Sequence, residues 1–399
     1  MHGSAGDLRE VVILSGVRTP IGSFGGALAN SSPAELGAAV IRQAVARAGL
    51  EPGRVDEVML GCVLQAGQGQ NVARQAALKA GLPVEVPAMT VNHLCASGLR
   101  AVALAAQAIA AGDADVVVAG GTENMSQAPY LVPRARFGYR MGDGVLVDSM
   151  IRDGVWCAIT DQHMGESVER IARRCGISRQ DQDEFALHSQ QKAAQALERD
   201  RFAAEITLVP AVVNRERRDF ARDEHPRPGV TLEKLSGLKP AFRPDGTVTA
   251  GNASGINDGA AALVLAASSL AEERRLPVLA RFVAGAWIGL DPGQWPLGPV
   301  GAVRKVLDRA GWRLPEVGLI ECNEAFAAQT LAVIRTLELN PAIVNVNGGA
   351  IALGHPIGAS GARILVTLLH EMAKRDTRRG LATLCVGGGQ GMAVLVERS

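Results

Sequence analysis

The chain has 399 residues, 47% hydrophobic and 20% charged, which is enough apolar material for two or three packed cores and too little charge for disorder. Its 41 Lys and Arg residues balance 40 Asp and Glu residues and aromatic residues make up only 4%, so the basic field and stacking rings of a nucleic-acid-binding protein are lacking. Apolar stretches such as 260–267 are much shorter than a bilayer span, and residues 1–10 do not resemble a secretory signal. We therefore expect a cytoplasmic protein with neither nucleic acid nor membrane as a partner.

Six cysteines are scattered through the chain without the paired spacing of a zinc cage or a disulfide framework. We expect free thiols in a reducing compartment and no metal site. Glycine is frequent, at 46 residues, and it concentrates at 347–361 and 387–391. Because glycine lets the backbone approach a ligand closely, these two stretches are the first places to look for a site.

Hydrophobic periodicity predicts alternating strands and helices, and the pattern occurs twice. The first pass predicts strands at 11–14, 57–60 and 116–119, with helices at 34–48 and about 95–111. The second predicts helices at 300–310 and 358–374, with strands at 319–320 and 381–386. This order indicates an α/β protein with a parallel-rich sheet in each half.

Corresponding residues in the two occurrences of this pattern differ in residue number by a nearly constant offset. Arg47-Ala48-Gly49 recurs 262 residues later at 309–311, and Val55 recurs with the same offset as Val317. The segment ASGLR at 96–100 recurs 263 residues later as ASGAR. We interpret the offset as an internal duplication of a βα unit. The segment between the copies, about 122–250, contains charge clusters and prolines, so we expect a long insertion with more loop than core.

Cys95 follows a short apolar strand and stands where a long Ala-rich helix is expected to begin. Unpaired N–H groups and the helix dipole favour a thiolate at such a position, and the thiolate is the nucleophilic form of cysteine. The alternative is a small buried core residue, which is the commoner fate of a free cysteine.

His355 lies in the glycine-dense segment NGGAIALGHPIG at 347–358, just before another predicted helix. Histidine titrates near neutral pH and can take a proton from a thiol. Two alternatives stay open for this turn. The imidazole can simply bond to backbone, or the turn can bind a ligand phosphate, although the chain has no GxxxxGK[ST] motif.

Two further segments offer polar groups at strand ends. Cys385 begins CVGGGQG, whose glycine amides can point at an oxyanion, although a tight turn after a core cysteine explains it equally. Asn323 follows a short predicted strand and can hold a water or a carbonyl, or merely cap a helix. Together, two thiols and a histidine at such junctions form a coherent acyl-transfer set: nucleophile, base, second acid or base, and oxyanion donors.

These motifs resemble the signatures of the thiolase family. The resemblance runs in order from about residue 11 to the C-terminus and is carried by RTPIG at 18–22, VNHLCASG at 91–98, GGTENMS at 120–126, TAGNASG at 249–255, NEAFA at 323–327 and the His355 and Cys385 turns. It implies two duplicated α/β halves in a five-layered αβαβα arrangement with an inserted loop domain. The implied divisions are 1–121 plus 251–277 for the N-terminal half, 122–250 for the loop domain, and 278–399 for the C-terminal half.

The resemblance also implies the roles of the candidate catalytic residues. Cys95 attacks an acyl thioester, and His355 takes its proton and helps to form one oxyanion hole with a water held by Asn323. A second hole uses the N–H groups of Cys95 and Gly387. Cys385 removes the α-proton from the second acyl-CoA. The implied reaction is ping-pong acyl transfer with acyl-CoA and CoA as partners, without a metal or redox cofactor, in a homotetramer or homodimer.

Substrate contacts follow from the same resemblance. Ser254 is expected to bond the pantetheine, and Arg227 to lie near the nucleotide, although a solvated surface position explains Arg227 equally well. The thioester pocket is expected to be lined by His163, Met164 and Phe326. The sequence departs from acetoacetyl-specific members at DPGQW, 291–295, where Trp295 replaces a Met lining the acyl pocket and should narrow or reshape it.

The sequence therefore favours an acetyl-CoA acetyltransferase that condenses two acetyl-CoA or cleaves a 3-ketoacyl-CoA. The closest alternative is a 3-ketoacyl-CoA thiolase of broader chain-length range, as in fatty-acid β-oxidation. A ketoacyl synthase is disfavoured because such enzymes pair their cysteine with two histidines, whereas the second acid or base position here is Cys385. A third alternative is a thiolase-like protein that binds CoA esters or lipids without turnover.

Overall fold

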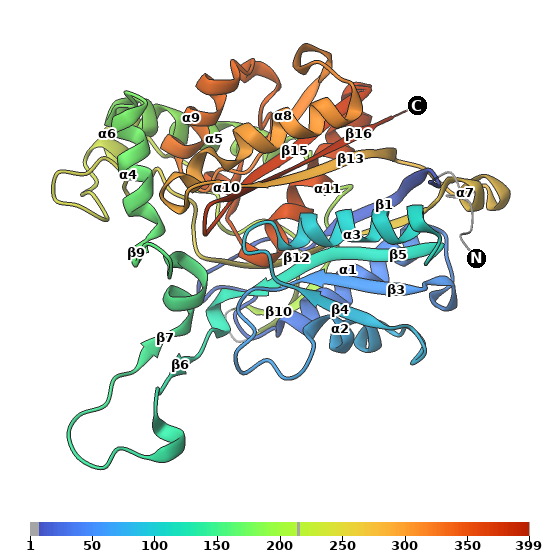
Figure 1. Ribbon diagram of the computed structural model, residues 1–399, viewed down its shortest axis with the longest axis horizontal. Coiled ribbons are helices and arrows are strands. Elements are labelled where there is room, and N and C mark those ends of the chain that lie inside the picture. The colour runs from blue at the N-terminus through green and yellow to red at the C-terminus, as the bar shows by residue number, and fades with distance from the viewer. Residues whose placement is uncertain (1–7, 214–215, 399) are drawn as a thin grey trace, which may run out of the picture.

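The computed structural model describes residues 8–213 and 216–398 (Figure 1). Most of the N-terminal stretch searched for a secretory signal therefore lies outside the described residues. One mixed sheet runs through both halves in the order β14-β15-β16-β13-β1-β12-β5-β3-β4, with β2 beside β12. Its two parts join at β1 and β13, which share only the pairs Val12 with Arg281 and Ile13 with Ala280.

The predicted elements are confirmed in both halves. The first half contains β1 (Val11–Arg18), α1 (Pro33–Arg47), β3 (Glu57–Gly61), α3 (Ser97–Ala111) and β5 (Val116–Asn124). The second contains α8 (Gly298–Ala310), β14 (Leu319–Cys322), α11 (Ile357–Arg375) and β15 (Arg379–Val386). The remaining core elements are β2 (Gly22–Ser23), α2 (Val72–Ala80), β4 (Ala88–Val91), β12 (Asn257–Ala267), α7 (Ser268–Arg274), β13 (Ala280–Gly289), α9 (Ala327–Leu337), α10 (Ala350–Leu353) and β16 (Gln390–Glu397).

The expectation of parallel-rich sheets is wrong. Among the described strands of the large sheet, only β3 with β4, β3 with β5, and β14 with β15 pair in parallel. β12 lies antiparallel between β1 and β5. β16 folds back on β15 through a short turn in which Gly388 and Gly389 adopt positive φ, a conformation that glycine allows without strain.

The layers follow the order αβαβα, as the resemblance implied (Figure 1). α1 packs on β12, β5 and β1 at one outer face, with α2 against α1, while α8 packs on β16, β13 and β15 at the other. α3 and α11 lie between the two parts of the sheet and contact each other, β5 and β12. Their apolar side chains form one central cluster with strand residues from both halves, such as Ile13 and Leu384.

Glycine makes the central layer thin. A Cβ on Gly98 of α3 would lie 2.9 Å from the backbone N of Ala362 on α11, and one on Gly121 of β5 would lie 2.0 Å from the carbonyl oxygen of Gly358. The stretch 94–111, which includes α3, is apolar and long enough to cross a membrane, although the sequence analysis found no such stretch. In this protein 56% of that stretch is buried, where α3 packs between two layers of sheet, and the core helix of a layered fold needs such an apolar face without any membrane.

The inserted segment is more helical than expected. It contains the helices α4 (Met164–Arg174), α5 (Arg179–Glu198) and α6 (Leu232–Ser236), and the hairpins β6–β7 (Tyr130–Leu131, Val147–Asp148), β8–β9 (Trp156–Cys157, Gln162–His163) and β10–β11 (Val209–Val213, Glu216–Phe220). The loop expectation fails because capping boxes such as that of Ser178 start helices despite the high charge. A buried ion network anchors the segment to β1, where Arg18 binds Glu205 and Asp223. The β6–β7 hairpin extends away from the body of the molecule (Figure 1).

Candidate active site

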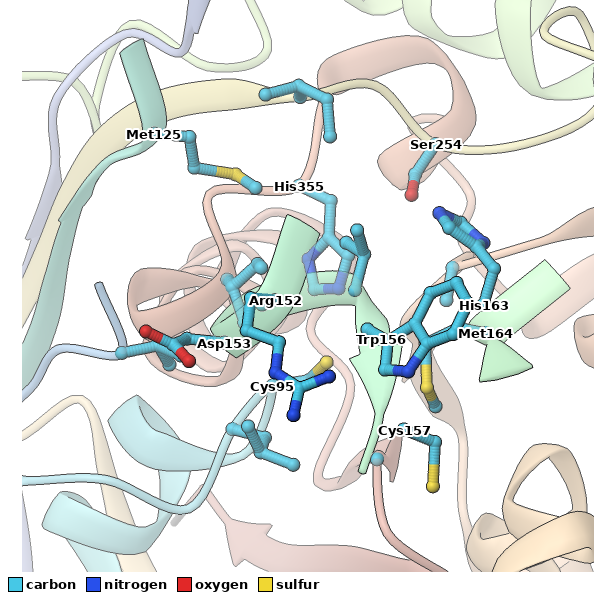
Figure 2. A pocket seen from close by; sticks show the side chains of 18 of the residues that line it. Cys95, Met125, Arg152, Asp153, Trp156, Cys157, His163, Met164, Ser254 and His355 are labelled. Carbon is cyan, nitrogen blue, oxygen red and sulfur yellow. The ribbon is translucent and has the colours of Figure 1, made fainter. Parts of the chain in front are cut away.

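A cavity of about 790 Å³ lies where the strand ends of both halves meet the inserted segment (Figure 2). Eight of the eleven site residues expected from the sequence line it: Cys95, His163, Met164, Ser254, Trp295, Phe326, His355 and Gly387. Asn323 and Cys385 are buried beside it rather than in its wall. Arg227 is exposed and lies outside the wall.

The expectation of a thiolate at Cys95 is wrong for the free protein. α3 begins only at Ser97, so Cys95 stands ahead of the helix rather than in its first turn. Burial raises the pKa of the Cys95 thiol to about 11, and hydrogen bonding from the N–H groups of Gly387 and of Cys95 itself opposes that shift only in part. The thiol is therefore protonated at neutral pH and needs a base before it can act as a nucleophile.

His355 has the properties of that base. Burial, with the positive charge of Arg363 adding to it, lowers the pKa of the imidazole to about 4, so the ring is neutral at pH 7. Its Nδ1 lies 2.5 Å from Ser360 Oγ, and that hydroxyl donates to the carbonyl of Pro356 at 2.8 Å. The single hydroxyl proton is thus committed, so Nδ1–H donates to Ser360 and the Nε2 lone pair is left to accept a proton.

The duplication extends to the serine that supports this turn. Ser97 and Ser360 are equivalent positions, 263 residues apart, in the first turns of α3 and α11. Ser97 Oγ donates to the carbonyl of Leu94 and accepts from the N–H of His93. Each serine therefore closes the turn that carries a candidate catalytic residue, Cys95 in one half and His355 in the other.

Asn323 lies beside the imidazole. Its Nδ2 is 3.5 Å from His355 Nε2, and its Oδ1 is buried with no hydrogen-bond partner among residues 8–213 and 216–398. A helix-capping role is wrong, because α9 begins at Ala327 with Phe326 as its N-cap. The side chain instead offers one donor and one acceptor next to His355.

Cys385 lies at the end of β15, fully buried in an apolar cluster that also contains Trp295 and Ala325. Burial, followed by the negative charges that Cys95 and Cys322 carry when ionised, raises the pKa of its thiol far above the usual value. The N–H of Gly387, two residues after Cys385, bonds the sulfur of Cys95, so the two thiols lie in one neighbourhood, and an ionised Cys95 makes ionisation of Cys385 harder.

The turn after Cys385 serves two different sulfur atoms. The N–H of Gly387 bonds the sulfur of Cys95, and the next N–H, of Gly388, bonds the sulfur of Cys157. Burial acts to raise the pKa of the Cys157 thiol, but hydrogen bonds from Thr160, Ile159 and Gly388 outweigh it and lower the pKa. Cys157 lines the cavity and was not anticipated, because no periodic pattern marks its segment.

Aromatic rings form the apolar side of the cavity. His163 stacks on Phe242 at 4.6 Å between ring centroids, and Phe326 packs edge-on against Phe242 at 6.2 Å and Trp295 at 6.1 Å. In Figure 2 the Ser254 hydroxyl points into the space beside His163. The wall is thus apolar with few polar groups, which is typical of a site for an acyl chain or a pantetheine arm.

Two buried side chains that sequence reasoning did not assign hold the catalytic turns. Asn257 Oδ1 accepts the N–H of His355 at 2.9 Å, and Gly354, at φ +105°, leaves room for that amide. The Glu123 carboxyl accepts the N–H groups of Val63, Leu64 and Gly358. Glu123 lies within GGTENMS and Asn257 two residues after TAGNASG, so their place in or beside the quoted motifs was the available signal.

Arg227 lies on the surface of the inserted segment, where its N–H donates to Gln190 Oε1. It stands near His225, whose pKa is lowered to about 4 by burial and then by the charge of Arg227. The structure therefore does not bring Arg227 to the reacting groups.

The comparisons agree with this geometry. The model of the thiolase N-terminal domain matches residues 11–269, and that of the thiolase C-terminal domain matches 276–398. An acetyl-CoA acetyltransferase of Pseudomonas aeruginosa is 59% identical over 98% of this chain and 100% of its own, and one of Cupriavidus necator is 55% identical over the same shares. The crystal structure of the Bacillus anthracis acetyl-CoA acetyltransferase superposes with a TM-score of 0.97 at 46% identity, covering 98% of this chain and 100% of that one. Human mitochondrial 3-ketoacyl-CoA thiolase superposes at 0.96 with 40% identity, covering 99% and 100%. The chain belongs to the thiolase family.

Proposed function

We propose that the chain is an acyl-CoA C-acyltransferase, specifically an acetyl-CoA acetyltransferase, that works through an acyl-Cys95 intermediate. The observation that supports this most directly is that one cavity is lined by a protonated thiol, Cys95, and by a neutral imidazole, His355, whose Nε2 carries no proton. Nε2 takes the thiol proton as sulfur attacks the thioester carbonyl, and the CoA thiolate leaves with that proton.

Charge on the reacting oxygens needs oriented donors. The N–H groups of Cys95 and Gly387 are proposed to form one oxyanion hole. Nε2–H of His355, once protonated, and a water held by Asn323 are proposed to form the other. The unpaired Oδ1 of Asn323, in the described part of the chain, supports this role because it can accept a hydrogen bond from such a water.

Cys385 is proposed to handle the α-proton. In condensation it removes that proton from a second acetyl-CoA, and in thiolysis it protonates the leaving carbanion. Its raised pKa suits the protonated form that thiolysis requires. The scheme uses CoA as a substrate and no metal or redox cofactor.

Substrate contacts are proposed along the cavity wall. Ser254 is assigned to the pantetheine, and Arg227, from its exposed place in the inserted segment, to the nucleotide. His163, Met164, Phe326 and Trp295 are assigned to the thioester and acyl group. Because the cavity is large and apolar, a broader 3-ketoacyl-CoA thiolase is the second candidate. A binding protein without turnover is less well supported, because the Cys95 thiol has a proton to give and the neutral His355 imidazole can accept it.

The test is thiolysis of acetoacetyl-CoA by purified protein with CoA, followed as loss of the magnesium-enolate absorbance. We expect turnover, with Cys95→Ala unable to form an acyl-enzyme and Cys385→Ala able to form it but unable to exchange the α-proton of acetyl-CoA. CoA-ester binding without turnover would favour the carrier, and a stable acyl adduct on Cys385 rather than Cys95 would reverse the two roles. A series of longer 3-ketoacyl-CoA substrates separates the acetyl-specific from the broader enzyme.

We further propose a cytoplasmic location and a division of the chain into an N-terminal half (1–121 plus 251–277), an inserted loop domain (122–250) and a C-terminal half (278–399).

We also propose that the chain assembles into a homotetramer or homodimer. Two features support assembly. The β6–β7 hairpin exposes large apolar side chains, such as Phe137 and Met141, and β4 is an open edge of the large sheet. Sedimentation velocity at micromolar protein concentration tests the proposed assembly, and a monomer would contradict it.

A further inference from the structure

The β8–β9 hairpin of the inserted segment lies against the glycine turn that follows Cys385. A Cβ built on Gly388 would lie 3.7 Å from the Cδ1 atom of Ile159 in the hairpin. One built on Gly387 would lie 3.5 Å from the Cε atom of Met164, which follows the hairpin directly. These are ordinary contact distances. The hairpin therefore packs on the turn whose Gly387 N–H is proposed to stabilise an oxyanion.

Cys157, at the end of β8, makes this contact polar. Its sulfur accepts hydrogen bonds from the N–H groups of Ile159 and Thr160 in its own hairpin, and from the N–H of Gly388 in the turn. Asp, Asn and Ser side chains commonly bond backbone N–H groups a few residues further on in turns, and here a sulfur does the same. The bond to Gly388 is of another kind, because it joins the inserted segment to the C-terminal half of the chain.

The environment of Cys157 strengthens these bonds. Burial acts to raise the pKa of its thiol, but the hydrogen bonds outweigh burial and lower the pKa. Hydrogen bonds to an ionised acceptor are stronger than those between neutral groups, so the link to Gly388 is strongest when the sulfur is a thiolate. Only 4% of Cys157 is exposed, and water therefore competes little for the sulfur.

Three consecutive glycines leave the turn flexible unless contacts hold it. Gly388 and Gly389 adopt positive φ, and glycine reaches other conformations at little cost. On one side, the carbonyl of Gly389 accepts the N–H of Leu290 at 2.8 Å. On the other, the N–H that Cys157 binds belongs to the planar peptide group that joins Gly387 to Gly388. Fixing that plane restricts the direction in which the N–H of Gly387 can point.

We propose that Cys157 is a positioning residue for acylation: its sulfur holds the turn so that the N–H of Gly387 points at Cys95 and at the oxyanion that forms in the attack. The N–H of Gly387 does bond the sulfur of Cys95 in this structure. The inference rests on the proposed function for the oxyanion, and it adds a residue of the inserted segment to the groups that prepare the site. Because the sulfur bonds backbone rather than the ester, its loss should slow acylation more than it weakens binding.

The test measures acylation in variants that lack the sulfur. Cys157→Ala removes the acceptor, and Cys157→Val removes it while keeping much of the side-chain volume, so two independent chains carry the test. Each is mixed with acetyl-CoA, quenched on the millisecond scale and analysed for acyl-Cys95 by mass spectrometry. Removing an oxyanion donor outright slows turnover by about 10²–10³-fold, so releasing one from its support should slow the saturating acylation rate by about tenfold. The half-saturating acetyl-CoA concentration should change less than twofold.

Cys157→Asp tests the acceptor itself. A carboxylate can accept backbone N–H groups a few residues further on as well as that of Gly388, so this variant should be acylated within about threefold of the unsubstituted rate. Cys175→Ala is the matched control, because it removes a thiol of the same inserted segment, at the end of α4 and outside the cavity wall. It should leave the acylation rate unchanged.

Acylation within twofold of the unsubstituted rate in both Cys157→Ala and Cys157→Val would overturn the proposal. So would a Cys157→Asp chain as slow as Cys157→Ala, or a weaker affinity for acetyl-CoA at an unchanged acylation rate, which indicates a packing role alone. Failure of the proposed function is distinguishable, because the unsubstituted chain then forms no acyl-Cys95 and the inference falls with it. Normal acylation of the unsubstituted chain and of both sulfur-free variants removes the inference alone.

Discussion

The Nδ1 atom of His355 lies 2.5 Å from the hydroxyl oxygen of Ser360, in the first turn of the helix that follows. This contact selects the tautomer in which Nε2 is free to accept a proton. The hydroxyl that orients the base thus comes from its own turn. Among residues 8–213 and 216–398, no carboxylate bonds the imidazole, so no such group there pairs with the imidazolium formed during acylation.

Ser360→Ala should slow acylation by about 10- to 100-fold, because the imidazole loses both its orientation and its fixed tautomer. The measurement is the pre-steady-state rate of acyl-enzyme formation from acetyl-CoA. Thr367→Ala is the control, since Thr367 is a buried hydroxyl on the same helix that bonds Glu205 away from the cavity. An unchanged acylation rate in Ser360→Ala would contradict the assignment.

The pKa of His355 predicts how stability depends on pH. Burial and then the charge of Arg363 lower the pKa in the folded state from 6.5 to about 4, so the unfolded chain binds a proton at higher pH than the folded chain does. The stabilisation is fully present above pH 6.5 and is lost as the pH falls towards 4. Between pH 7 and 4.5 this group should account for about 2 kcal/mol of lost unfolding free energy.

Urea unfolding at the two pH values checks this, with His355→Gln expected to lose less stability on acidification than the unsubstituted chain. The pKa of His225 is lowered as well, so His225→Gln should also lose less stability on acidification and is not a control without effect. Equal pH dependence in His355→Gln and the unsubstituted chain would mean that the imidazole has the same pKa in the folded and unfolded states.

Glu123→Gln should destabilise the fold by about 2–3 kcal/mol. Both carboxyl oxygens accept backbone N–H groups, Oε1 from Leu64 and Oε2 from Val63 and Gly358, so an amide must turn its NH₂ towards another donor. Since Gly358 lies three residues after His355, acylation should slow as well. Urea unfolding and burst kinetics measure the two effects, and Glu233→Gln on exposed α6 should change neither.

Gly121→Ala should destabilise the protein by about 1–3 kcal/mol or more, because the added methyl meets the backbone carbonyl of Gly358, which cannot yield as a flexible side chain would. Gly237→Ala is the control, since its Cβ would meet nothing closer than 3.6 Å and its φ is −73°. Urea unfolding measures both variants. If Gly121→Ala loses no more unfolding free energy than Gly237→Ala, the central layer can expand to admit the methyl group.

Much of the fold could be predicted because local patterns repeat. The offset of 262 that related Val55 to Val317 also relates the short 3₁₀ turns Pro52–Arg54 and Leu314–Glu316, so the copies keep their register beyond the identical residues. Strand direction could not be predicted in the same way. The apolar run of β12 indicates a buried strand, but its antiparallel place between β1 and β5 depends on partners more than 100 residues away.

At the site, too, local motifs could be predicted and long-range effects could not. The motif residues Cys95 and His355 were found from their turns, and the structure brings both to one cavity. The protonation of Cys95 could not be found, because the helix-start argument is local whereas burial, which wins, is a property of the whole assembly of layers.

The reaction centre depends on the contact between the two copies in the central layer. Cys95 lies in the turn before α3 of the first copy and His355 in the turn before α11 of the second, and the two helices contact each other through glycine. Neither copy holds both the nucleophile and its base, so the reaction centre is complete only when the two copies pack against each other.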